Sequence, residues 1–371
     1  MLAAYHLRSG IGRYLEGLLG ALGRMDLPFE LTLLSRRNEL ERRIGPVSWP
    51  VVETDLRALS AGEQLGVGRL VPACDLLVWP FVNVPLWGRR PDVVTIHDTC
   101  HLDHPECFPG GLKRWLLRRL YARAARAQRI LVPSRFTAER LHHHFGTPTD
   151  RIRVVPLAGG TAFERPASAE QRRAAIERHG LPDDSVVFVG NCKPHKNLAG
   201  LLSAMVRLDE RGKGLPLVVV GEFQQNLDAL LRRAPAARPW VHGVGQINDD
   251  DLVPIVAGAR AMVLPSFYEG FGMTALEAMT VGTPVVCSDI PALRELAGEA
   301  AEFVDPHDPD GIAAGIERVT ADASRRDELI AAGRRRAGEF SWSDAARRTV
   351  EVYCELLGTS PASTPASSSQ E

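Results

Sequence analysis

The sequence predicts an α/β protein with two doubly wound, Rossmann-like domains. Short runs of Val, Ile and Leu alternate with longer segments of helical periodicity along the chain, which is typical of parallel sheets with crossover helices. A stretch rich in Gly, Pro and Ala, VPLAGGTAFERPAS, interrupts this alternation from residue 155 and predicts a linker. The 371 residues are enough for two domains that each bury a core.

The apolar runs place the expected strands in chain order. The N-terminal domain is expected over residues 1–160, the C-terminal domain over 165–340, and a final helix over 341–357. Residues 358–371 are rich in Ser, Pro and Ala and are expected to form a disordered tail, because they cannot bury apolar area. Strands are expected near 75–79, 92–96, 129–132, 152–155, 185–189, 215–220, 261–264, 284–287 and 301–304.

Composition excludes several classes of function. A net charge of −1 argues against a general nucleic-acid binder. No apolar run approaches twenty residues, so no membrane-spanning helix is expected. The six cysteines include no Cys-x-x-Cys pair, which fits reduced thiols and a cytoplasmic location.

The segment 262–296 carries the strongest indication of function. A short apolar strand, 262–264, leads into a loop with Glu269, and Phe271-Gly272 opens a helix in which Glu277 is expected about two turns in. Free N–H groups at the start of this helix would bind a phosphate, and the carboxylates would accept hydrogen bonds from sugar hydroxyls. A diphosphate flanked by two polyols is a nucleotide sugar. The alternative is two solvated surface glutamates.

This segment closely resembles the signature of the retaining family-4 glycosyltransferases, a Glu, seven residues and a Glu around Phe-Gly. Three other stretches resemble that family in the same order: SGIGRYLEGLL at 9–19, VVTIHD at 93–98 and VGNCKPHKNL at 189–198. The likeness covers roughly residues 9–357. It implies the glycosyltransferase-B architecture, in which two Rossmann-like domains face each other across the active site and the last helix crosses back onto the first domain.

The resemblance also implies a reaction and roles for named residues. A hexose would move from a nucleoside-diphosphate sugar to an acceptor hydroxyl with retention, without a metal ion or other cofactor. Glu269 would hold the sugar hydroxyls, Lys196 the diphosphate, and His97 the sugar from the opposite domain; these three are the candidate catalytic residues. Donor contacts are expected from Gly10, Gly12, Asn191, Lys193, Phe271, Gly272, Met273, Thr274 and Glu277, the last on the ribose.

Two of these positions leave alternatives open. Many family members carry an arginine where this chain has Asn191, so either Lys193 helps to neutralise the diphosphate or one charge contact is missing. His97 and Asp98 could instead form a turn in which Asp98 caps the next segment.

A zinc site from His97, His101, His104, Cys100 and Cys107 is not expected, because the spacing does not match a finger or ribbon. Asp249-Asp250-Asp251 is interpreted as helix caps rather than a metal motif.

Residues 112–129 form a basic, amphipathic pattern. Seven Lys or Arg and no acid lie between positions 113 and 129, interleaved with Trp115 and several leucines. One interpretation is a helix that contacts anionic lipid at the inner face of the cell membrane. The other is a core helix with a solvated basic face.

The substrates are less well defined. The GIGRY start and the PHKN variant look most like bacterial mannosyltransferases of surface-polysaccharide assembly, so GDP-mannose is the first expectation for the donor and a saccharide or polyprenyl-linked saccharide for the acceptor. UDP and dTDP sugars remain open. The alternatives are a nucleotide-sugar epimerase on the same fold and a non-catalytic nucleotide-binding subunit of a glycosylation complex.

The beginning of the chain carries one further expectation. In doubly wound domains the glycine-rich segment follows a central first strand, but MLAAYHLRS contains no run of Val or Ile long enough for a buried strand of five or six residues. The first strand is therefore expected to be absent, with Met1 an internal methionine.

Overall fold

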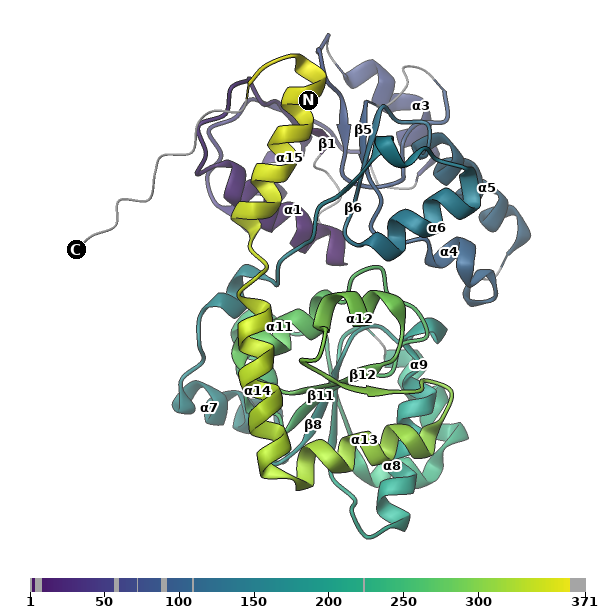
Figure 1. The fold of residues 1–371 in the computed structure, drawn as a ribbon, viewed down its shortest axis with the longest axis vertical. Coiled ribbons are helices and arrows are strands. Elements are labelled where there is room, and N and C mark those ends of the chain that lie inside the picture. The colour runs from purple at the N-terminus through teal and green to yellow at the C-terminus, as the bar shows by residue number, and fades with distance from the viewer. Residues whose placement is uncertain are drawn as a thin grey trace, which may run out of the picture.

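The computed structural model describes residues 2–3, 9–56, 60–71, 73–87, 92–108, 110–222 and 224–360. It consists of two α/β domains stacked along the long axis of the molecule (Figure 1). Residues 361–371, most of the expected tail, lie outside the described residues.

The N-terminal domain has a parallel sheet. Within the described residues its strand order is β3-β2-β1-β4-β5-β6-β7. The strands are β1 (Leu2–Ala3), β2 (Leu33–Ser35), β3 (Val51–Glu53), β4 (Val78–Trp79), β5 (Val93–Thr95), β6 (Arg129–Val132) and β7 (Ile152–Val154). The helices are α1 (Ser9–Leu22), α2 (Arg37–Ile44), α3 (Ala61–Leu70), α4 (Cys100–Asp103), α5 (Gly111–Ala124) and α6 (Arg135–Phe145).

The expectation that the first strand is absent was wrong. Leu2 pairs with Leu33 on one side and with Val78 on the other, so β1 occupies the central position of the sheet. The prediction required five or six buried residues, but the two neighbouring strands are themselves only three and two residues long. Two residues of β1 are enough to join strands of that length.

The C-terminal domain has a second parallel sheet, of order β10-β9-β8-β11-β12-β13. Its strands are β8 (Val186–Val189), β9 (Leu217–Val220), β10 (Val241–Gly245), β11 (Ala261–Leu264), β12 (Val285–Ser288) and β13 (Glu302–Val304). Its helices are α7 (Ala169–His179), α8 (Leu198–Glu210), α9 (Gln224–Arg233), α10 (Asp249–Gly258), α11 (Met273–Val281), α12 (Pro291–Ala297), α13 (Pro309–Ala321) and α14 (Ala323–Ala337).

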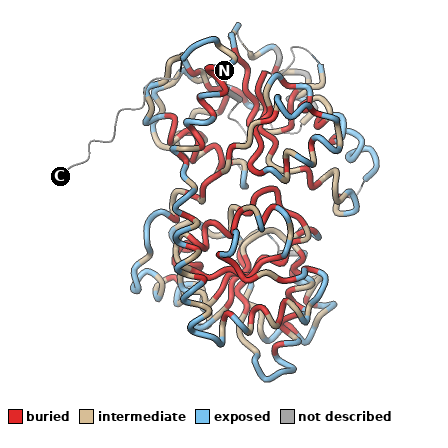
Figure 2. Tube along the Cα trace, in the orientation of Figure 1, coloured by how far each residue is buried: buried red, intermediate tan, exposed pale blue. Residues whose placement is uncertain are grey.

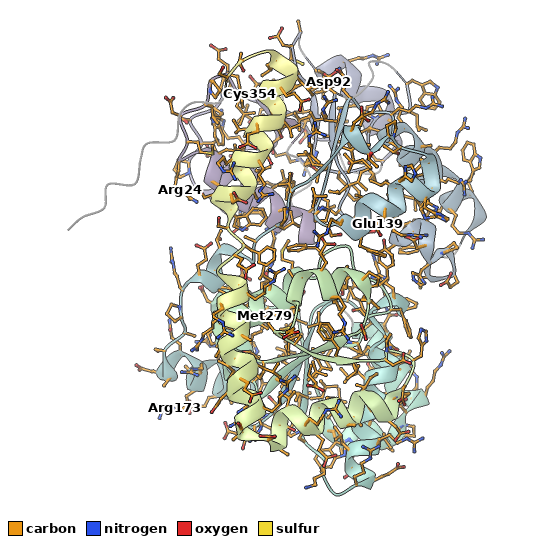
Figure 3. The ribbon with its side chains drawn as sticks, in the orientation of Figure 1. Arg24, Asp92, Glu139, Arg173, Met279 and Cys354 are labelled. Carbon is orange, nitrogen blue, oxygen red and sulfur yellow. The ribbon has the colours of Figure 1, made fainter. Side chains whose placement is uncertain are left out.

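Each domain has its core along its sheet, where Figure 2 shows the buried chain gathered in the centre. Strands β9, β11 and β12 are buried at every residue, as expected for parallel strands covered by helices on both faces. Side chains of both domains extend into the region where the two domains meet (Figure 3).

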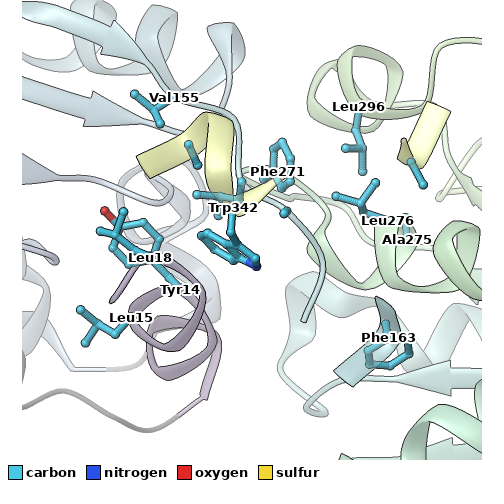
Figure 4. Packing of buried hydrophobic residues seen from close by; sticks show 14 of the residues in the cluster. Tyr14, Leu15, Leu18, Val155, Phe163, Phe271, Ala275, Leu276, Leu296 and Trp342 are labelled. Carbon is cyan, nitrogen blue, oxygen red and sulfur yellow. The ribbon is translucent and has the colours of Figure 1, made fainter. Parts of the chain in front are cut away.

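The last helix, α15 (Trp342–Leu357), returns to the N-terminal domain and packs on α1 (Figure 1). Its N-cap, Ser341, accepts a hydrogen bond from Asp344 N at 3.0 Å. Trp342 lies beside Tyr14 (Figure 4) and donates from Nε1 to the Gly159 carbonyl in the linker at 2.8 Å. A Cβ atom at Gly17 would lie 2.0 Å from the Trp342 ring, so α1 and α15 approach closely only because residue 17 is glycine.

No helix in the described part of the chain is long and apolar enough to cross a lipid bilayer.

Candidate active site

The loop after β11 and the start of α11 form the centre of the site. Gly272 caps α11 with φ of +100°, and a Cβ atom there would lie 2.5 Å from Leu293 Cδ2, so both backbone and packing require glycine. Met273 and Thr274 form the first turn of α11, where backbone N–H groups lack intrahelical partners. Glu277 is the fifth residue of α11, so it lies one turn into the helix rather than the expected two.

Lys196 and Glu269 form a close ion pair. Lys196 ends the short 3₁₀ segment Pro194–Lys196, and Asn197 caps α8 by accepting from Gly200 N at 3.1 Å. Lys196 Nζ donates to both carboxylate oxygens of Glu269, at 2.7 and 2.8 Å. Ser266 Oγ also donates to Glu269 Oε1, at 2.7 Å. Glu269 is buried, so its charge depends on these donors.

His195 supports this pair from the neighbouring position. It is buried, and its carbonyl accepts a hydrogen bond from Phe267 N at 2.8 Å, which ties the Lys196 segment to the Glu269 loop. Burial, with the nearby Lys196 ammonium as a second cause, lowers the pKa of His195 to about 4. The ring is therefore neutral at physiological pH.

Glu277 meets the N-terminal domain through Arg13. Arg13 Nη1 donates to Glu277 Oε1, and Arg13 Nη2 donates to Asp249 Oδ1 at 2.6 Å. Gly160 N donates to the same Glu277 oxygen at 3.1 Å. Burial raises the pKa of Glu277, and the Arg13 guanidinium opposes that shift.

His97 faces the C-terminal domain with its backbone. Its ring Nε2–H donates to the Pro80 carbonyl at 2.9 Å, and the ring packs edge-on against Tyr14. A Cβ atom at Gly270 would lie 2.1 Å from the His97 carbonyl oxygen, so the Gly270 backbone packs directly on His97. Asp98 Oδ1 accepts from Cys100 N at 2.9 Å, so Asp98 does cap the following segment.

Further bonds dock the Glu269 loop on the N-terminal domain. Ser134 Oγ donates to the Gly270 carbonyl at 2.6 Å, and Thr99 N donates to the Tyr268 hydroxyl at 3.2 Å. A cavity of about 300 Å³ remains beside the loop, lined by residues of both domains. Its lining is Asp103, His104, Phe136, Arg140, Phe267, Tyr268, Glu269, Ile290 and Pro291.

Some of the remaining residues that were predicted to contact the donor also lie near this site. Gly10 and Gly12 lie in the first turn of α1. Asn191 Oδ1 accepts from Lys193 N at 3.2 Å, so this side chain holds the turn after β8. Lys193 Nζ lies 5.7 Å from the centroid of the Phe108 ring in the N-terminal domain. Phe271 is buried, and its ring packs edge-on against Phe340.

Comparison with known proteins decides the family. Residues 8–158 match the model described as Glycosyltransferase Family 4, and residues 171–336 match Glycosyl transferases group 1. The O-antigen chain mannosyltransferase B of Escherichia coli is 34% identical over 70% of this chain and 69% of its own length. The chain belongs to the family-4 glycosyltransferases.

Other relatives of this glycosyltransferase agree. The serotype-specific mannosyltransferase WbdA of Escherichia coli is 29% identical over 76% of this chain, but the match spans only 35% of WbdA. The crystal structure of Anabaena HepE in complex with UDP-glucose has the same fold, with a TM-score of 0.74 at 17% identity, covering 95% of this chain and 98% of that one. The glycosyltransferase-B architecture and the hexose-transferring class predicted from the sequence are therefore confirmed.

Three further findings concern possible metal ligands, the start of α10 and a hollow outside the site of this glycosyltransferase. Among the described residues no group of three His, Cys, Asp or Glu side chains is arranged to hold a metal ion. Asn248, not the aspartates, caps α10 by accepting from Asp251 N at 3.0 Å, so the interpretation of Asp249–Asp251 as caps was wrong. A hollow of about 680 Å³ lies between α13 and α14, at the end of the domain remote from the junction (Figure 1).

The sequence reasoning missed Arg13, Ser266 and Tyr268. All three lie inside motifs that were identified, Arg13 and Tyr268 directly beside named residues and Ser266 three positions before one. Arg13 directly follows Gly12, and Ser266 and Tyr268 precede Glu269. A charged or hydroxyl-bearing residue within a motif is the only signal that the sequence offers for them.

Proposed function

We propose that this glycosyltransferase moves a hexose, mannose in the first instance, from a nucleoside-diphosphate sugar to a saccharide hydroxyl, with retention and without a metal ion. The observation that carries the proposal is the Lys196–Glu269 pair beside the N-terminus of α11. It combines a cation and helix amides for a diphosphate with a buried carboxylate for sugar hydroxyls.

Lys196 and Glu269 bind each other through the same groups that would bind the diphosphate and the sugar, so a bound donor would separate them. With the donor bound, Lys196 turns from the carboxylate to the anionic diphosphate, and Glu269 accepts hydrogen bonds from the neutral sugar hydroxyls in place of the ammonium. Ser266 continues to orient Glu269, since its hydroxyl already lies 2.7 Å from Oε1. Glu277 accepts from the ribose, and the His97 backbone closes the sugar site from the N-terminal domain.

The reaction needs position and charge stabilisation more than a dedicated nucleophile. The acceptor oxygen bonds to the anomeric carbon on the face from which the diphosphate leaves, the bond from that carbon to the diphosphate oxygen breaks, and the leaving oxygen takes the acceptor proton. Lys196 and the amides of Gly272, Met273 and Thr274 stabilise the charge that develops on the diphosphate. This assignment requires no divalent ion.

The choice of mannose follows the named relatives. Two of them, the O-antigen chain mannosyltransferase B and WbdA, are mannosyltransferases by name, and the first is 34% identical. We infer GDP-mannose as donor and a growing surface saccharide, free or polyprenyl-linked, as acceptor.

A donor assay tests this function. The protein is incubated with GDP-mannose, UDP-glucose and dTDP-glucose in EDTA, and nucleoside diphosphate and sugar products are followed by NMR. We expect GDP release from GDP-mannose, undiminished by EDTA, with α-mannose as the anomer formed first, before it mutarotates. An isomerised nucleotide sugar would indicate an epimerase, and binding without turnover a non-catalytic subunit. A strict Mg²⁺ requirement, or a β-configured product, would contradict the proposed mechanism.

We further propose that α5 docks the N-terminal domain on anionic lipid. Leu117, Leu120 and Tyr121 are buried in the core, but Leu112, Trp115 and Leu116 form a second apolar stripe that is exposed at 81, 56 and 39%. Lys113, Arg114, Arg118 and Arg119 flank this stripe. An apolar stripe between cations matches a bilayer surface rich in anionic headgroups. In this proposal α5 has one side in the core and another side on the lipid, so both interpretations of its sequence apply.

Vesicle sedimentation tests the lipid contact. Arg118→Glu with Arg119→Glu should reduce cosedimentation with phosphatidylglycerol vesicles by about tenfold or more, because each basic residue contributes about 1 kcal/mol near such a surface. Arg232→Glu with Arg233→Glu, on the exposed end of α9, makes the same charge change and should have no such effect. Equal losses in the two variants, or no binding by the wild type, would contradict the lipid contact.

A further inference from the structure

Arg13 joins the two domains at the back of the site. It lies in α1 of the N-terminal domain, yet its guanidinium pairs with Glu277 on α11 and with Asp249 on α10. Its central carbon also lies 5.7 Å from the centroid of the Phe163 ring in the linker. A single side chain thus contacts both domains and the segment between them.

The two oxygens of Glu277 have different surroundings. Oε1 accepts from both Arg13 Nη1 and Gly160 N. Among the described residues, no hydrogen bond to Oε2 is present. Oε2 is also not one of the fully buried polar atoms that lack a partner in this part of the chain, so a part of its surface is accessible. A carboxylate held through one oxygen presents the other to a ligand.

The packing around this contact leaves little room for another arrangement. A Cβ atom at Gly160 would lie 2.8 Å from Arg13 Nη1 and 3.0 Å from Glu277 Oε1. The Glu277 side chain is 5% exposed and the Arg13 side chain 23%. A carboxylate buried to this degree needs a cation and hydrogen-bond donors to stay ionised, and Arg13 supplies the cation from the opposite domain.

We propose that Arg13 is a positioning residue that holds Glu277 Oε2 toward the ribose of the donor and so couples donor binding to closure of the two domains. The coupling arises because Arg13 reaches Glu277 only when the domains are together, so a donor that needs an oriented, ionised Glu277 binds the closed form more tightly. This inference rests on the proposed function, in which Glu277 binds the ribose.

A double-mutant cycle tests it by calorimetric titration with GDP, UDP and dTDP. Wild type, Arg13→Met, Glu277→Gln and the double variant are compared for the nucleotide that binds the wild type most tightly. We expect each single substitution to weaken affinity about tenfold and the double variant to bind no more weakly than Glu277→Gln, since Arg13 acts through Glu277. Arg13→Lys should recover part of the loss.

Thr161→Val is the matched control. Thr161 Oγ1 donates to Glu16 at 3.1 Å, so this variant removes a neighbouring bond between the linker and α1 without touching Glu277, and its nucleotide affinity should equal that of the wild type. Losses that multiply in the double variant, or a lower melting temperature of Arg13→Met with unchanged affinity, would overturn the positioning role. A wild type that binds none of the three nucleotides would instead overturn the proposed function itself, and this inference with it.

Discussion

At the scale of single residues, the site is a set of ionisable groups kept out of water by contact between the domains. Glu269 pairs with Lys196, Glu277 pairs with Arg13, and burial, with Lys196 as a second cause, lowers the pKa of His195. A buried ion pair contributes little net stability, but breaking one partner leaves an uncompensated charge. Such pairs are therefore suited to exchange partners with a charged ligand.

His195 predicts a dependence of stability on pH. Its pKa is about 4 in the folded protein against about 6.5 when exposed, so between these values the unfolded chain binds a proton that the folded chain does not. Its contribution to stability is complete above about pH 6.5 and is lost as pH falls toward about 4. His195→Asn should flatten this loss, by up to about 3 kcal/mol at the acid end.

Urea unfolding at several pH values between these limits measures the effect. His143→Asn, on the exposed end of α6, is the control and should keep the wild-type pH dependence. If the free energy of unfolding falls with pH equally in His195→Asn and in the wild type, His195 is not the group that causes the loss of stability in acid.

The positions of the candidate site residues were predictable to the extent that motifs mark them, and their roles stay predictions. Lys196, Glu269 and Gly272 were named from local patterns and lie together at the junction. The pairing of Arg13 with Glu277, 264 positions apart, was not predictable, because no local pattern reports a contact that only domain closure creates.

At the scale of elements, the sequence predicted the strands that it writes as apolar runs and missed four others. All nine expected strands correspond to strands in the structure, but β1, β2, β3 and β10 were not predicted. Strands β3 and β10 lie at sheet edges, and β10, VHGVG, contains two glycines and a histidine. Such a strand is held by pairing with its neighbour rather than by its own β propensity.

The loop that contains Gly270 predicts an effect on closure. An alanine Cβ at position 270 would meet the His97 carbonyl at 2.1 Å and Asp98 Cβ at 2.7 Å, so Gly270→Ala should hold the domains apart at this contact. Transfer should fall by about tenfold or more, because reacting groups misplaced by 1 Å lose much of their rate. Nucleoside diphosphate affinity should fall by no more than the roughly tenfold expected for Arg13→Met, because domains held apart lose the Arg13–Glu277 contact while the diphosphate contacts of the C-terminal domain remain.

Steady-state transfer rates and calorimetry compare Gly270→Ala with Gly258→Ala. A Cβ atom at Gly258 would make only ordinary contacts, at 3.8 Å or more, so that variant should behave as wild type. Unchanged transfer by Gly270→Ala would show that the loop does not need this close approach.

At the scale of the whole molecule, the chain crosses between its domains twice, through the linker before α7 and through the turn into α15. Trp342 fixes both crossings, since it packs on Gly17 of α1 and donates to Gly159 of the linker. The site lies on the other side of these crossings, where Tyr268 and Gly270 bond to Thr99 and Ser134. This arrangement suits opening about the crossings to admit a donor and closing to assemble the site.

The central claim is that Glu269 acts on the sugar and Glu277 on the nucleotide. The most direct measurement compares Glu269→Gln and Glu277→Gln for GDP affinity by calorimetry and for mannosyl transfer from GDP-mannose. Glu269→Gln should lose transfer by about a hundredfold or more while binding GDP as the wild type does, whereas Glu277→Gln should lose roughly 1 to 3 kcal/mol of GDP affinity. Equal loss of GDP affinity in both variants, or wild-type transfer by Glu269→Gln, would contradict this division of roles.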